Sequence, residues 1–178
     1  MKSPIKDMCL IAVFVALIAV MSQIAIPLPT GVPLVLQTFA VMLTGSVLGA
    51  RKATAALCVY LLLGAAGVPV FTLAGGASGF HRIIGPWGGY LMSYPFVAFT
   101  VGLGADSRKR VLLPISLAAG IIINLSLGTF WYWITSTEIA FKGAFFAAFV
   151  PFILPEIIKA VMAFTVSRAV KRVLIKII

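Results

Sequence analysis

The residues best suited to chemistry are Glu156 and Lys159, an acid and a base three positions apart in an apolar segment. On a helix, positions i and i+3 share one face, so the two side chains can meet. The surrounding segment, Gly143–Val170, is long and hydrophobic enough to cross a bilayer. A charge at membrane depth costs about 2.5–3.5 kcal/mol or more unless it is paired or faces a polar cavity. The pair therefore either neutralises itself for insertion or faces inward and binds something polar.

Composition places the chain in a membrane. Of its 178 residues, 62% are hydrophobic and only 10% are charged. A soluble domain carries about 25% charged residues, so this chain could not cover a water-facing surface. Its apolar runs, about 20 residues long, suit spanning helices and not the alternating strands of a barrel. The sequence predicts an all-α integral membrane protein embedded in the lipid bilayer, with one domain over residues 1–178.

Short polar gaps divide the chain into six apolar spans. We expect them at Met8–Ile26, Leu34–Ala50, Ala53–Gly67, a fourth ending at Ala105, Val111–Ile134 and Gly143–Val170. Of the 14 basic residues, 11 lie on one side of the membrane, Arg82 and Lys142 lie on the other, and Lys159 is embedded. Because positive residues remain on the cytoplasmic side, both termini are predicted to be cytoplasmic. The net charge of +10 thus reflects orientation in a membrane, and no nucleic-acid partner is expected.

The third and fourth spans are separated by a long loop, Val68–Gly89, rich in glycine and aromatic residues. Long loops in compact folds often serve as lids or binding loops, and the charge distribution puts this one outside the cell. It also contains Arg82 and the chain's one histidine, His81. With no second histidine and no nearby acid, His81 does not indicate a metal site. We expect a glycine-rich extracellular lid between helices 3 and 4.

The available residues exclude several classes of protein. The chain has no Gly-x-x-x-x-Gly-Lys-[Ser/Thr] phosphate loop, so it does not hydrolyse ATP by that route. A membrane protease or phosphatase needs two carboxylates, several histidines or a nucleophile–base pair, and an ion channel needs repeated polar positions along a pore. Cys9 and Cys58 lie in apolar segments, where buried free thiols are expected and not a disulfide. No enzymatic activity and no cofactor are predicted.

A helical bundle with an outer lid and a buried charge pair is predicted to hold a pocket that opens outward. Such a pocket suits a small, mainly apolar molecule with a few polar groups. A ligand with a urea-like head and an acid tail would satisfy Glu156, Lys159 and Arg82 together, because carboxylates accept from N–H donors while cations bind carboxylates or carbonyls. Tyr90 could pack against the rings of that ligand.

Two further candidates for ligand binding lie at the outer ends of their spans. Gln37 and Thr38 lie at the outer end of the second span, Leu34–Ala50. Trp131 belongs to an aromatic band with Tyr132 and Trp133, of the kind that anchors helices at a membrane interface. Anchoring is expected for two of the three rings, and Trp131 is retained as the binding candidate.

Several motifs, in order along nearly the whole chain, resemble a known family. They are Ile26-Pro-Leu-Pro-Thr-Gly-Val-Pro33 with Leu36-Gln-Thr-Phe-Ala-Val-Met-Leu43, Tyr60-Leu-Leu-Leu-Gly-Ala-Ala-Gly-Val-Pro-Val-Phe71, Gly85-Pro-Trp-Gly-Gly-Tyr-Leu91, Gly128-x-x-Trp131 and Pro151-Phe-x-x-x-Glu-x-x-Lys159. Each motif is weak alone, but together they are specific. The chain resembles the BioY family, the biotin-specific S components of energy-coupling factor (ECF) transporters.

The resemblance implies a function and a set of partners. A similar protein would have six helices in a prokaryotic cytoplasmic membrane and capture biotin at the outer face. Transport would be driven by a transmembrane coupling subunit and two ATPase subunits. In similar S components an Ala-x-x-x-Ala stripe on the first helix docks on the coupling subunit, and Ala12 and Ala16, followed by Ala19, fit that pattern. The same stripe could instead serve internal packing.

The resemblance also implies that Glu156 and Lys159 contact the ligand, and it gives Arg82 the place of a basic loop residue. The chain departs from the family at two positions: Pro155-Glu156 stands where Gly-Asp is usual, and Trp87 stands where Thr is usual. A Glu carboxylate lies roughly 1.5 Å further from the backbone than that of Asp. It could therefore shift the ligand or favour an analogue, and Trp87 adds bulk to the lid.

Two functions of other classes remain open at this point. The chain could be a self-sufficient secondary carrier that uses Glu156 as its proton site. It could also be a purely structural membrane subunit that binds no ligand.

Overall fold

The computed structural model describes residues 4–26, 34–72, 79–107, 109, 111–136 and 140–177, with side chains as far as Val173. Its elements follow in the order α1 (Pro4–Ser22), β1 (Ala25–Ile26), β2 (Leu34–Val35), α2 (Gln37–Leu48), α3 (Ala50–Ala65), α4 (Phe80–Ile84), α5 (Gly88–Asp106), α6 (Leu112–Thr135), α7 (Phe141–Ala148) and α8 (Val150–Ile177).

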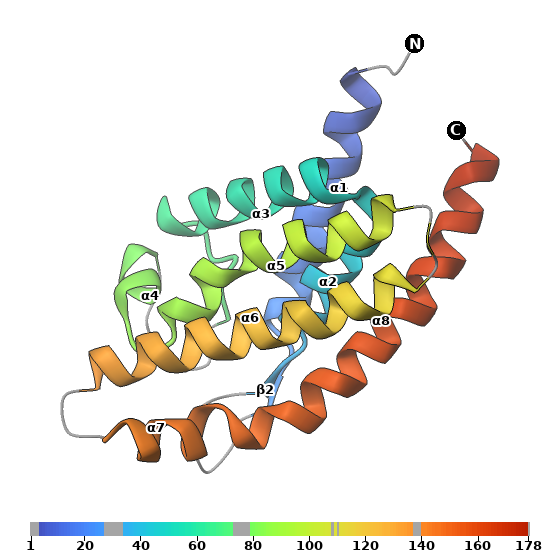
Figure 1. Cartoon of the computed structure of the whole chain (residues 1–178). Coiled ribbons are helices and arrows are strands. Elements are labelled where there is room, and N and C mark those ends of the chain that lie inside the picture. The colour runs from blue at the N-terminus through green and yellow to red at the C-terminus, as the bar shows by residue number, and fades with distance from the viewer. Residues whose placement is uncertain are drawn as a thin grey trace.

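The long helices form one bundle. α5 packs against α2, α3 and α6, and α8 closes the bundle by packing against α2 and α6. Figure 1 shows the start of α1 and the end of α8 at one end of the molecule, with α4 and the start of α7 at the other. Both ends of the chain therefore lie on the same side of the bundle. This arrangement is compatible with the prediction that both termini lie on one side of the membrane.

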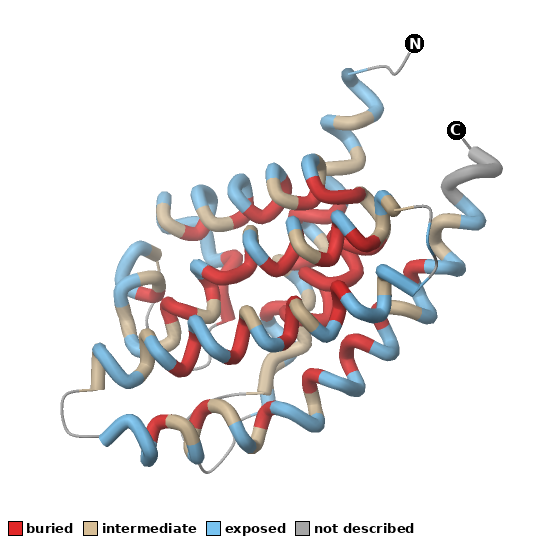
Figure 2. Tube along the Cα trace, viewed as in Figure 1, coloured by how far each residue is buried: buried red, intermediate tan, exposed pale blue. Residues whose placement is uncertain are grey.

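α2 lies at the centre of the bundle, where every residue from Gln37 to Ser46 is buried. Figure 2 shows the buried positions gathered on the inner sides of the helices. On α8 the buried residues recur at helical spacing, as Phe152, Glu156, Lys159, Ala160, Ala163 and Ser167. That spacing gives the helix one inward face. Glu156 and Lys159 occupy this face, so the fold directs both charges to the interior while apolar side chains cover the outside.

Small residues allow the helices to approach closely at the end opposite α4. A Cβ added to Gly102 on α5 would lie 2.4 Å from the backbone nitrogen of Ala50. Gly49, between α2 and α3, has a positive φ of 78° that favours glycine. The Asp106 carboxylate accepts a 2.9 Å hydrogen bond from the Ala50 N–H. These contacts connect the end of α5 to the α2–α3 junction.

Three stretches of the described chain are long and apolar enough to cross a membrane: Pro4–Ser22, Leu112–Thr135 and Phe141–Val173. The last includes both α7 and α8. α2 is apolar but shorter, with 12 residues. The described part of the structure thus has helices able to cross a membrane.

The structure corrects several expectations about local structure. β1 and β2 form a short antiparallel ladder in which Ala25 pairs with Val35 and Ile26 with Leu34, so the chain is not entirely helical. Three prolines and a glycine in Ile26–Pro33 predict a turn after the first span, but residues 27–33 lie outside the described part. Within the predicted structureless loop Val68–Gly89, residues 73–78 are not described, but α4 forms and α5 already begins at Gly88.

The last apolar segment is not one continuous helix. It is interrupted at Phe149, between α7 and α8, two residues before Pro151. Pro151 has no N–H to donate to the carbonyl four residues earlier and its ring crowds that carbonyl, which favours a break in the helix here. Pro155 instead lies inside α8.

Cys9 and Cys58 are free, as expected, but both are exposed and not buried. Each lies on an outward helix face, which apolar side chains can present to lipid.

Candidate ligand-binding site

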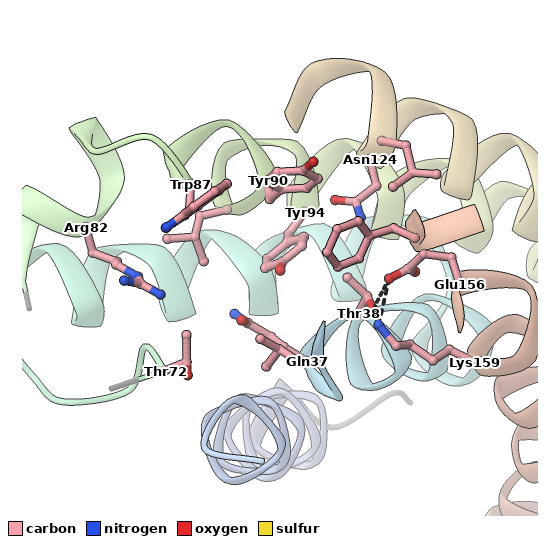
Figure 3. Close-up of a pocket in the computed structure, with 14 residues that line it drawn as sticks. Gln37, Thr38, Thr72, Arg82, Trp87, Tyr90, Tyr94, Asn124, Glu156 and Lys159 are labelled. Atoms are coloured by element: carbon pink, nitrogen blue, oxygen red, sulfur yellow. Dashed lines mark hydrogen bonds and ion pairs between the residues drawn. The ribbon is translucent and has the colours of Figure 1, made fainter. Parts of the chain in front are cut away.

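A cavity opens among α2, α4, α5, α6 and α8, and Figure 3 shows the side chains that surround it. The space between atoms there is about 570 Å³, its open mouth included. The lining residues are Val35, Gln37, Thr38, Thr72, Arg82, Trp87, Tyr90, Leu91, Tyr94, Asn124, Leu125, Phe152, Glu156 and Lys159. Five of the six predicted ligand-binding residues therefore line one cavity.

Glu156, Lys159 and Thr38 form a closed triangle at one end of the cavity. Lys159 Nζ lies 2.7 Å from Glu156 Oε1 in an ion pair and donates to Thr38 Oγ1 at 2.8 Å. Thr38 Oγ1 in turn donates to the same Glu156 Oε1 at 2.8 Å. All three residues are buried, with Glu156 only 2% exposed. A buried ion pair is costly unless further hydrogen bonds satisfy it, and Thr38 supplies two of them.

The second carboxylate oxygen of Glu156 is arranged differently. Among the described residues, Glu156 Oε2 is buried and has no hydrogen-bond partner. A buried acceptor without a partner costs about 1–3 kcal/mol, and more when charged. Because Glu156 lines the cavity, a ligand N–H placed there would supply the missing bond. This oxygen is the strongest indication that the cavity is built for a donor group.

Arg82 lies at the other end of the cavity, on α4, with Thr72 near it (Figure 3). Its side chain is 5% exposed. Burial lowers the pKa of the Arg82 guanidinium from its usual value, but arginine remains charged in proteins. A guanidinium at this place can bind a carboxylate in two parallel hydrogen bonds. The two polar ends are thus chemically distinct, one with an acid and an ammonium and the other with a guanidinium.

Aromatic side chains form much of the wall between the two ends. Trp87 stacks on Tyr132 with ring centroids 4.7 Å apart. This stacking holds the Trp87 ring in the wall of the cavity. Tyr90 donates a 2.6 Å hydrogen bond to the Ala148 carbonyl at the end of α7. A Cβ on Gly128 would lie 2.2 Å from the Tyr90 ring. Glycine in the Gly128-x-x-Trp131 motif therefore leaves room for Tyr90.

Trp131 lies outside the lining. Its indole N–H donates a 3.0 Å hydrogen bond to the Gly85 carbonyl, and a Cβ on Gly89 would lie 2.2 Å from its own Cβ. Trp131 thus fastens the connection between α4 and α5 to α6. The structure gives it a role in holding this connection and does not bring it to the cavity.

Several lining residues were not among the predicted ones, and Asn124 and Thr38 are the most informative. Asn124, 2% exposed on α6, makes a 2.8 Å hydrogen bond with Ser93. In the sequence, Asn124 and Thr38 stand out only as polar residues inside apolar spans, and such residues usually face the interior of a bundle. That signal does not say which of several inward residues converge on one cavity.

The alanine stripe on α1 divides into two parts. Ala12 and Ala16 are exposed, while Ala19 is half-buried and packs against the core. Ala12 and Ala16 therefore remain available for a contact with another helix, and Ala19 serves internal packing.

Sequence comparison assigns the chain to a family. The profile of the BioY family matches residues 1–176. The chain belongs to the BioY family. The probable biotin transporter BioY of Pyrococcus horikoshii is 40% identical over 162 residues, covering 91% of this chain and 94% of that protein. The biotin transporter BioY2 of Lactococcus lactis is 38% identical over 175 residues, covering 97% and 94%.

A solved structure has the same fold as this BioY-family chain. It is a crystal structure at 2.1 Å of the S component for biotin from an ECF-type ABC transporter. The two superpose with a TM-score of 0.81, cover 94% of this chain and 92% of that one, and are 26% identical. With its membrane-capable helices and its membership of a family of transporters, the chain is a membrane protein.

Proposed function

We propose that this chain is the high-affinity biotin-binding S component of an ECF-type transporter in a prokaryotic cytoplasmic membrane. The observation that carries the proposal is the pattern of polar groups in the cavity: a buried, unpartnered Glu156 Oε2 at one end and Arg82 at the other. Biotin has a ureido head with two N–H donors and an acid tail. The family membership and the crystal structure of a biotin S component support the same ligand.

The proposed pose follows from matching charges and hydrogen bonds. The ureido head lies at Glu156 and Lys159, where the carboxylate accepts an N–H and the ammonium can donate to the ureido carbonyl. The carboxylate tail lies at Arg82. Tyr90 and Trp87 pack along the apolar part of the ligand. Because Glu156 is tied through Oε1 to Thr38 and Lys159, Oε2 is the carboxylate oxygen left for the ligand.

The proposed topology is six spans with both termini cytoplasmic and the α3–α4 connection as an extracellular lid. Support comes from the distribution of basic residues and from the position of the chain ends on one side of the bundle. Energy would come from a transmembrane coupling subunit and two ATPase subunits, since this chain has no phosphate loop. We assign the contact with the coupling subunit to Ala12 and Ala16.

A proton-coupled carrier is less consistent with the geometry. Glu156 is already ion-paired with Lys159 and accepts from Thr38. Loss of the Glu156 charge would leave the buried Lys159 ammonium without its counter-charge, which is costly, so the geometry favours a lasting ion pair.

The first experiment identifies and measures the ligand. Mass spectrometry of the protein purified in detergent should find biotin bound one to one. The variant Glu156→Gln with Lys159→Gln removes both charges without leaving one unpaired. It should bind biotin at least about 100-fold more weakly, which is about 2.7 kcal/mol, with an unchanged circular dichroism spectrum. Wild-type affinity in this double variant would contradict the site.

Proteoliposomes separate the transport mechanisms. The chain alone, with labelled biotin and a pH gradient, should accumulate nothing. Reconstituted with a coupling subunit, two ATPase subunits and ATP, it should take up biotin. Accumulation by the chain alone would favour the secondary carrier, and a purified protein that binds no vitamin would favour a structural subunit.

A further inference from the structure

A buried chain of hydrogen bonds leads from the cavity to the start of the α3–α4 connection. Gln37 Nε2 on α2 donates to the Tyr60 hydroxyl on α3 at 2.7 Å. The Tyr60 hydroxyl donates to the Val70 carbonyl at 2.8 Å. Ser22 Oγ on α1 lies 2.6 Å from the same carbonyl. Gln37 is 1% exposed and Tyr60 is fully buried, so water does not compete for these bonds.

Counting protons along this chain fixes the orientation of the Gln37 amide. A carbonyl oxygen can only accept, so the single proton of the Tyr60 hydroxyl must point to Val70. The Tyr60 oxygen can then only accept from Gln37, which must present its NH₂ group. A reversed amide would bring two oxygens to 2.7 Å with no proton between them. The Gln37 amide oxygen is therefore turned away from Tyr60.

The remaining amide oxygen belongs to the cavity. Gln37 lines it, and within the described part of the chain its side-chain hydrogen bond runs from Nε2 to Tyr60, which leaves Oε1 for a ligand. Gln37 is followed directly by Thr38, which holds Glu156. The first turn of α2 thus helps to set up two acceptors. One is Gln37 Oε1 itself. The other is Glu156 Oε2, which is left without a partner while Thr38 donates to Oε1 of the same carboxylate.

We propose that Tyr60 is a positioning residue that locks Gln37 as a hydrogen-bond acceptor for a ligand N–H, so that the cavity selects ligands carrying two N–H donors. The inference rests on the proposed biotin function. Biotin has two ureido N–H groups, and two oriented acceptors, Glu156 and Gln37, match them. Tyr60 does not touch the ligand and acts through Gln37.

The test uses biotin and two analogues, each methylated at one of the two ureido nitrogens. Binding of all three to the purified full chain is measured by isothermal titration. Wild type should prefer biotin over the analogue that loses the Gln37 contact by about tenfold or more. Tyr60→Phe removes the hydroxyl and keeps the ring. It should bind biotin about tenfold more weakly and lose that preference, because Gln37 is then free to rotate.

Two substitutions at position 37 test the orientation directly. In Gln37→Glu the Tyr60 hydroxyl turns to donate to one carboxylate oxygen while Ser22 still donates to the Val70 carbonyl. The other carboxylate oxygen stays toward the ligand, so this variant should keep the preference for biotin over the methylated analogue. Gln37→Met has no acceptor and should lose the preference. If Gln37 instead offered its NH₂ to the ligand, both variants would lose it equally, and the inference would be overturned. This comparison stands even if Tyr60→Phe does not fold.

Coupling between the two residues gives a second criterion. In a Gln37→Met background, Tyr60→Phe should weaken biotin binding by no more than about twofold, because its effect acts through Gln37. Ser116→Ala is the matched control: it removes a buried hydroxyl away from the cavity and should keep both affinity and preference. Full additivity would contradict the positioning role. A wild type that binds no biotin would instead reject the proposed function.

Discussion

Thr38 on α2 and Glu156 on α8 lie 118 positions apart in the chain, and a 2.8 Å hydrogen bond joins their side chains. The same threonine hydroxyl accepts from Lys159. One neutral residue therefore connects both members of the ion pair to the central helix. Its effect is to occupy one carboxylate oxygen and leave the other for a ligand.

Thr38→Val should weaken biotin binding by about tenfold or more with little change in shape. Valine has nearly the same volume but no hydroxyl, so Glu156 loses a hydrogen bond to a charged group, worth about 1.5–3 kcal/mol. The carboxylate is then free to turn Oε2 toward Lys159. Thr38→Ser keeps the hydroxyl and should remain within about threefold of wild type. Isothermal titration decides the matter, and equal affinities for the valine and serine variants would refute the role of Thr38.

Arg82→Gln should weaken biotin binding by about 10- to 100-fold, because it removes a charge-assisted contact to the ligand carboxylate. Binding of biotin amide, whose tail is neutral, should change by less than about threefold. Lys142→Gln is the control for loss of a positive charge at an exposed position on the same side of the bundle and should affect neither ligand. A loss that is equal for acid and amide would mean that Arg82 does not hold the tail.

Ala12→Trp with Ala16→Trp should abolish assembly with the coupling subunit and uptake of biotin while leaving biotin binding intact. The two alanines are exposed and do not line the cavity, so bulk there blocks only an approaching helix. Ile122→Trp adds the same bulk at an exposed position on α6 and should still assemble. Co-purification with the coupling subunit measures the result. Assembly of the double variant would show that this face is not the contact.

The Glu156–Lys159 spacing predicted a shared helix face, and the structure has the two groups 2.7 Å apart on the inward side of α8. That prediction succeeded because i and i+3 geometry is local. Trp131 shows the limit of such reasoning. Its place in a motif made it a candidate for ligand binding, but its indole bonds to Gly85. Whether an aromatic side chain faces a cavity or supports a neighbouring segment depends on how helices distant in the sequence pack. A local sequence motif does not contain that information.

By itself, the sequence determined that this chain belongs in a membrane, that its helices are apolar, and that one acid–base pair shares a helix face, since composition and helical period act over a few residues. Only the tertiary structure decided that Thr38 completes the pair, that Arg82 faces it along one cavity, and that Tyr60 orients Gln37. Those relations join residues tens of positions apart. They exist only after helix packing has brought the groups within the roughly 3 Å reach of a hydrogen bond.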